Sequence, residues 1–245
     1  MDIKCILEEG LKINATCSFE TLRLREDGYD RDAYENRTQL TVEFTHGYFD
    51  EETDSYEEKT VASMKFYIFK YREYDEINEI SDVTGYDNMM GVDTAMKYFD
   101  MCKKNPDGND TYEYISSGGN INVCYLHEFY INTEYRGQGL SEYLLCMIPT
   151  ILNEYLGIVF GFVSTHIRPY KYQGRIEGDV LSKIEYDDDN AELMKIMEKP
   201  LLKVGFVQIG EGYDFATDLQ SLDHNAMERD IEAVFTGRYF GYNYE

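Results

Sequence analysis

Basic residues are scarce in this chain of 245 residues, and tryptophan is absent. Lysine and arginine together number 23 against 47 aspartates and glutamates, which gives a formal net charge of −24. A field of that sign repels the phosphates of nucleic acids and of anionic membranes, so we expect neither as a partner. The charge is compatible with a cationic substrate such as an amine, with imitation of DNA, or with a plain solvated acidic surface.

Long apolar runs are also missing. The longest, "YLGIVFGFV" at 155–163, is too short to cross a bilayer, and no N-terminal segment joins basic residues to an apolar core as signal peptides do. The five cysteines lie far apart with no pair at CxxC spacing, which indicates neither a disulfide framework nor a zinc site. We therefore expect a cytoplasmic protein without a bound metal.

The apolar residues that are present alternate in several segments of the N-terminal third. This alternation predicts strands within the first 25 residues, at 38–49 and at 60–71. The acidic stretch 50–59 is expected to be the solvated loop of a hairpin. From about 72 to 120 the pattern breaks, apart from a helix at 87–104, and we interpret this region as an insertion that covers one face of the domain.

A nearly continuous apolar run at 121–131 predicts a central strand buried on both faces. A glycine turn follows, then a helix at 140–155 that Pro149 should kink, then a second buried strand. Because strand, turn, helix and strand form a βαβ unit, the two strands should be parallel neighbours.

The last third of the chain predicts a helix that starts near residue 190, a strand, and a final helix at 221–235. Ser221 or Asp223 is expected to cap the final helix. No repeat and no linker divides the chain, so we expect one α/β domain of the mixed α+β kind at 1–245, with a C-terminal helical extension at about 221–245.

The turn "RGQGLS" at 136–141 has the features of an anion-binding site. Gly137 and Gly139 carry no Cβ, so the backbone can turn sharply and approach a ligand closely. The N–H groups that open the following helix lack intrahelical partners, and Arg136 adds charge-assisted hydrogen bonds. Together these groups outline a pyrophosphate site.

The stretch "LHEFYINTEYRGQGLSEYLL" resembles motif A of the GNAT superfamily of N-acetyltransferases, in which a strand is followed by Arg/Gln-x-x-Gly-x-Gly/Ala and a helix. Arg136, Gly139 and Ser141 occupy the three marked positions. The segment 190–206 resembles motif B of the same family, and the resemblance runs in order over roughly 59–218. It implies a mixed sheet that splays open between two parallel strands and is flanked by helices.

The resemblance also implies a reaction, the transfer of an acetyl group from acetyl-CoA to a primary amine by direct attack in a ternary complex. The amine would belong to a small molecule, or to a lysine or N-terminus of a peptide or protein. The pyrophosphate would lie on the backbone of 136–141, and the pantetheine arm along the preceding strand. The cofactor-binding residues so implied are Tyr130, Ile131, Arg136, Gly137, Gln138, Gly139, Leu140, Ser141 and Asn190.

This chain departs from the family in three ways. Ser141 stands where the family usually has glycine or alanine, and Leu201 stands where the family commonly has its general-acid tyrosine. Asn190 lies about one helical turn too far from Gly205 for the usual spacing.

Two residues are candidates for proton transfer. Glu128 lies where the family often places an acidic residue that faces the acceptor, and alternation puts Tyr130 on its side of the strand and His127 on the opposite side. Glu128 would act as the base, or would pair with a basic side chain and only position the substrate. His166, at the end of the second buried strand, is the other candidate.

Two further functions stay open. One is a cofactor-binding or protein-binding module on the same fold that has lost the chemistry, which Leu201 favours. The other is an acidic decoy that imitates DNA, and the phosphate cradle counts against it. The acceptor and the oligomeric state are not determined by the sequence.

Overall fold

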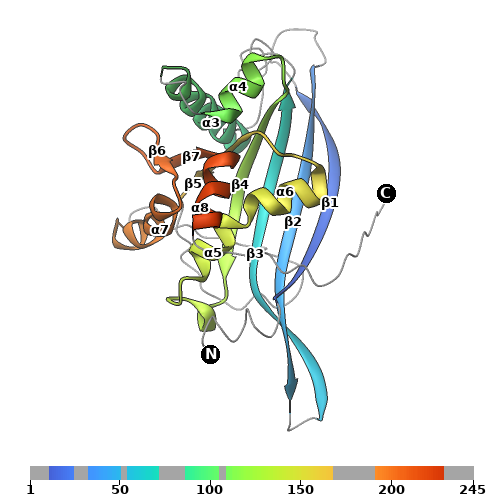
Figure 1. Cartoon of the computed structure of the whole chain (residues 1–245). Helices are drawn as coiled ribbons and strands as arrows, with labels where there is room; N and C mark the ends of the chain where they lie inside the picture. The colour runs from blue at the N-terminus through green and yellow to red at the C-terminus, as the bar shows by residue number, and fades with distance from the viewer. Residues whose placement is uncertain are drawn as a thin grey trace.

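The computed structural model describes residues 11–24, 33–50, 54–71, 86–104, 109–167 and 191–228. These residues form a mixed α/β fold in which one seven-stranded sheet has helices on both faces (Figure 1). The strands lie in the order β1-β2-β3-β4-β5-β7-β6. Their bounds are Leu11–Leu24 for β1, Ala33–Asp50 for β2, Ser55–Tyr71 for β3, Ile121–Ile131 for β4, Phe162–His166 for β5, Val207–Gln208 for β6 and Asp214–Asp218 for β7.

Neighbouring strands are antiparallel except at one place in the sheet. There β4 and β5 run parallel, which confirms the prediction from the βαβ pattern. The helix of that unit passes over one face of the sheet, as a right-handed crossover connection requires.

The long β2–β3 hairpin differs from its prediction. Asp50 pairs with Ser55, so the acidic residues at 55–59 belong to β3 instead of a loop. Their side chains point largely to water, and a charged side chain in water does not prevent the backbone from pairing. The predicted apolar face of β2 is confirmed, since Leu40, Val42 and Phe44 are completely buried.

Two helices cover one face of the sheet, α3 (Tyr86–Lys104) and α4 (Asp110–Ser116). The predicted helix at 87–104 is confirmed as α3, and its apolar stripe packs on β4, β5 and β7 side chains to form a core on this face, hereafter the α3-side core. The helical residues of that core are Val92, Ala95, Met96, Tyr98, Phe99 and Cys102.

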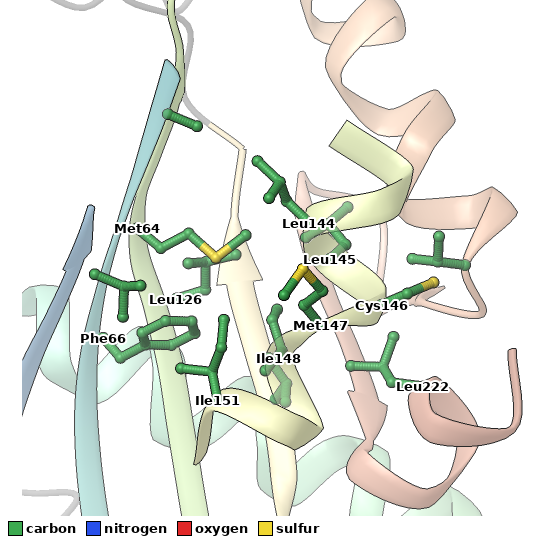
Figure 2. Packing of buried hydrophobic residues seen from close by; sticks show 14 of the residues in the cluster. Met64, Phe66, Leu126, Leu144, Leu145, Cys146, Met147, Ile148, Ile151 and Leu222 are labelled. Atoms are coloured by element: carbon green, nitrogen blue, oxygen red, sulfur yellow. The ribbon is translucent and has the colours of Figure 1, made fainter. Parts of the chain in front are cut away.

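The opposite face carries a larger core, hereafter the α5-side core, to which β1, β2 and β3 also contribute. Its helices are α5 (Leu140–Cys146), α6 (Ile148–Leu156), α7 (Ala191–Lys203) and α8 (Leu219–Glu228). Figure 2 shows how α5 and α6 lie against the sheet, with Leu144, Ile148 and Ile151 toward Met64, Phe66 and Leu126.

The helix predicted at 140–155 is divided into α5 and α6. Pro149 lies in the first turn of α6, where a backbone N–H group would have no intrahelical acceptor, so its absence costs no hydrogen bond. A second proline, Pro200, lies inside α7 without ending it. Within the described segments, no helix is both long and apolar enough to cross a membrane.

The final helix starts earlier than predicted and has a different cap. It begins at Leu219, and Asp218 accepts a hydrogen bond from the Ser221 N–H at 2.9 Å. The prediction of Ser221 or Asp223 as the cap is therefore wrong. The carboxylate of Asp218 also accepts from the Tyr98 hydroxyl at 3.0 Å, which ties α3 to the start of α8.

Candidate functional site

The parallel pairing of β4 and β5 is short. Four pairs join the strands, from Val123–Phe162 to Leu126–Thr165, and at the last of them Thr165 Oγ1 donates to the Leu126 carbonyl at 2.9 Å. β4 then continues to Ile131 beside β3 only. Among the described residues, no strand therefore pairs with the segment 127–131 on the side of β5.

A β-bulge lies at the same level of β4. Lys65 pairs with Glu128 while Phe66 pairs with Leu126, so His127 is an extra residue in β4. A bulge of this kind puts two successive side chains on one face of the sheet and increases the local twist. It lies at the first residue beyond the last β4–β5 pair.

The bulge overturns the predicted alternation along β4. Phe129 and Ile131 pack against the α5-side core, the same side as Leu126. The ring of His127 lies 4.9 Å from that of Tyr67, which belongs to the α3-side core. His127 and Glu128 therefore both lie on the α3 face of the sheet, because the extra residue interrupts the alternation of side chains between the two faces.

Glu128 is half-buried and has two basic neighbours. Its Oε1 lies 3.7 Å from Lys65 Nζ and 3.7 Å from His127 Nε2. These separations exceed hydrogen-bond length, so each is a looser electrostatic contact. Lys65 also lies over the ring of Tyr67, 5.3 Å from its centroid. The pairing with a basic side chain that the sequence left open is present.

His166 is the first residue of β5 beyond the last pair with β4. Its Nδ1 lies 2.9 Å from Oδ1 of Asp214, its cross-strand partner on β7. Two residues earlier, Ser164 donates to the carbonyl of Gly91 in α3 at 2.6 Å. By alternation His166 faces the α3 side as well. Sequence reasoning missed Asp214, because the cross-strand register that brings it to His166 has no local pattern.

The glycine loop follows β4 through a short 3₁₀ turn, η1 (Thr133–Tyr135). It is held to β3 by the Asn132 N–H, which donates to the Val61 carbonyl at 2.8 Å, and by the ion pair between Lys59 and Glu134. Gly137 and Gly139 have φ values of 77° and 82°, in the left-handed region that favours glycine.

This loop is open in the way an anion site requires. A Cβ added to Gly137 or Gly139 would meet no atom within 4 Å. The backbone N–H groups from Gly137 to Ser141 have no hydrogen-bond acceptor among the described residues. Five donors without an acceptor in the described residues, next to open space at both glycines, are the features that an anion site needs.

The other predicted residues of the loop have distinct places. Arg136 Nε donates to the Ile131 carbonyl at 2.8 Å, and the guanidinium lies 5.6 Å from the centroid of the Tyr130 ring. Arg136 thus covers the end of β4, and its remaining N–H groups have no acceptor among the described residues. The Gln138 side chain donates to the Glu134 carbonyl at 3.4 Å, while its own oxygen is buried without a partner.

Leu140, Leu201 and Asn190 complete the set of positions that the resemblance singled out. Leu140 is buried in the α5-side core, so only its backbone N–H is available to a ligand. Leu201 is buried in the same core and offers no proton. Asn190 lies outside the described residues. No group of three or more His, Cys, Asp or Glu in the described ranges is arranged to hold a metal ion.

Comparison with known proteins gives little to set beside this geometry. No family model matches the chain, and no curated protein matches it. Among solved structures, the chain is similar to a crystal structure of a point mutant of KacT. The two share 12% sequence identity over 76% of this chain and 74% of that chain, with a TM-score of 0.35. A TM-score below 0.5 carries no argument about function.

Proposed function

We propose that this chain is a GNAT-type N-acetyltransferase that moves an acetyl group from acetyl-CoA to a primary amine. One observation carries the proposal. The parallel pairing of β4 and β5 stops after four pairs, and the loop that follows β4 and its 3₁₀ turn has five N–H groups with no acceptor among the described residues. The order of the strands, with a single parallel pair in the middle of the sheet, also supports it.

The loop supplies the groups that would hold the cofactor. The N–H groups of Gly137 to Ser141 and the free N–H groups of Arg136 bind the pyrophosphate. The free edge of β4 near Tyr130 hydrogen-bonds the pantetheine arm. The Ile131 carbonyl already accepts from Arg136, so it contributes only a remaining lone pair. The cofactor itself supplies the activated acetyl group.

Glu128 is the base in this proposal. It lies half-buried at the edge where β4 and β5 separate, and its carboxylate accepts the proton that the amine loses. Lys65 Nζ lies 3.7 Å from the carboxylate and helps to hold it in place. The net charge of −24 attracts a cationic acceptor toward the protein.

A second function has one observation in its favour. The buried Leu201 removes the acid that the family commonly uses, which suits a protein that binds the cofactor without transferring the acetyl group. A DNA-imitating decoy has no use for the open N–H groups of the loop, and nothing else in the described residues favours it.

Calorimetric titration with acetyl-CoA, with free CoA as comparison, tests the proposal. We expect micromolar binding of both, about −8 kcal/mol. Thiol release is then measured with spermidine and with a lysine-containing peptide as acceptors. Binding followed by acetylation supports the enzyme. Binding with no acetylation of any amine favours the second function, and no binding to either ligand refutes both.

A further inference from the structure

We propose that His166, held by Asp214, is the general acid that protonates the departing thiolate in this reaction. The inference rests on the proposed function and assigns the step for which the family's tyrosine is missing. Asp214 is then a positioning residue, which the sequence did not single out.

The contact between the two side chains fixes the orientation of the imidazole. Nδ1 of His166 lies 2.9 Å from Oδ1 of Asp214, and both side chains are about one quarter exposed. When Nδ1–H donates to the carboxylate, the ring is held in one orientation and Nε2 points away from Asp214. No other polar contact engages His166 in the described residues. Its second nitrogen is thus available to a ligand.

The position of His166 in the sheet brings it to the point where chemistry is proposed. Leu126 and Thr165 form the last pair of β4 and β5, and His127 and His166 are the next residues on each strand. Both strands direct these side chains to the α3 face. Where β4 and β5 separate, His166 therefore lies on the β5 side and Glu128 lies on the β4 side.

The charged groups that face this region suit a base on the β4 side and an acid on the β5 side. On the β4 side are Glu128, His127 and Lys65, whose contacts hold a carboxylate able to accept a proton. On the β5 side the carboxylate of Asp214 accepts from the imidazole of His166, which leaves the other ring nitrogen to carry a proton toward a ligand.

The step balances in protons and electrons. The amine nitrogen forms a bond to the acetyl carbon, and its proton passes to the Glu128 carboxylate. The carbon–sulfur bond breaks with both electrons on sulfur, and the Nε2 proton of His166 passes to that sulfur to give the CoA thiol. Solvent then returns a proton to His166 and removes one from Glu128.

Nitrogen NMR of the imidazole rings tests the inference without an acceptor, and the chain has only four histidines to assign. Free CoA carries the thiol, whereas desulfo-CoA lacks it and keeps the phosphates. We expect the His166 Nε2 resonance to move with CoA and not with desulfo-CoA. The difference should disappear in Asp214→Asn. If both ligands bind by calorimetry and the His166 resonance is the same in the two complexes, the inference fails while the proposed function stands. If neither binds, the proposed function fails as well.

Kinetics with the lysine-containing peptide add a readout that a purely structural pair would not move. His166→Gln should lower kcat by about 100-fold or more, with the KM for acetyl-CoA within about twofold of wild type. Asp214→Asn should lower kcat less, and Asp214→Glu should restore part of the loss. His224→Gln, at an exposed position on α8, is the matched control and should leave kcat unchanged. A His166→Gln enzyme with normal kcat would refute the assignment.

Discussion

Replacing Gly139 by alanine adds a single carbon atom to the glycine loop and so tests the proposed phosphate site. The backbone there has a φ of 82°, and a residue with a side chain costs about 1–2 kcal/mol in this region. A Cβ would meet nothing within 4 Å, so no clash adds to that cost. In a chain of this length we expect Gly139→Ala to lower Tm by about 2–8 °C. The fold should otherwise be intact.

The same methyl group should also weaken cofactor binding, an effect separate from the loss of stability. It occupies the open space through which a phosphate would approach the five N–H groups of the loop. We expect the affinity for CoA, measured by calorimetry, to fall at least tenfold, about 1.4 kcal/mol.

Gly157 offers a matched control. It ends α6 with a φ of 64° and has equally open surroundings, but it lies outside the loop. Gly157→Ala should show a similar drop in Tm with unchanged affinity for CoA. The reasoning is refuted if the two variants bind CoA equally well, because the cost of the left-handed backbone would then be the only effect.

Three more perturbations follow from contacts described above. Glu128→Gln should leave CoA binding within about twofold and slow acetyl transfer about 100-fold or more, and an unchanged rate across pH would exclude Glu128 as the base. Asp218→Ala removes the cap of α8 and the acceptor of the Tyr98 hydroxyl, so urea unfolding should show a loss of about 2–4 kcal/mol, with a smaller loss for Asp218→Asn. Burial raises the pKa of Cys124 from 9.0 to about 12, and burial with the nearby Asp218 carboxylate raises that of Tyr98. The folded state therefore keeps these protons longer than the unfolded chain, and Tm should fall as pH rises above about 9. Cys124→Ala should reduce that alkaline slope, and a Tm independent of pH would contradict the assignment.

The elements with a strong local period could be predicted from the sequence. The alternation at Leu40, Val42 and Phe44 marks β2, and the helical stripe from Val92 to Cys102 marks α3. Both patterns are set by burial of one face, which the identities of the residues record directly. The parallel pairing of β4 and β5 was predictable for the same reason, because the connection between them has the length and pattern of a helix.

What could not be predicted depends on register between distant strands. An inserted residue such as His127 leaves no mark in a continuous apolar run, yet it decides which side chains accompany Glu128. Likewise, His166 and Asp214 are 48 residues apart, and only their pairing in the sheet brings them together. The sequence therefore predicted the glycine loop, Glu128 and His166, but not the partners that orient these two side chains.

The two prolines show the same limit at the level of helices. Pro149 lies where the helix begins anew, and Pro200 is accommodated inside α7. The turn that follows Pro200 buries Leu201 and Val204 completely or nearly so, and this packing offsets the missing hydrogen bond. The residue type is the same, and the tertiary contacts decide the outcome.

The two cores share no side chain, because the sheet separates them. Substitutions in one should add to those in the other without interaction, since residues without shared partners rarely couple. Under the proposed function, the residues around Glu128 and His166 on the α3 face could change over evolutionary time to suit a new acceptor. The α5 face beneath the glycine loop would meanwhile stay as it is, so selection for a different amine need not disturb the proposed cofactor site.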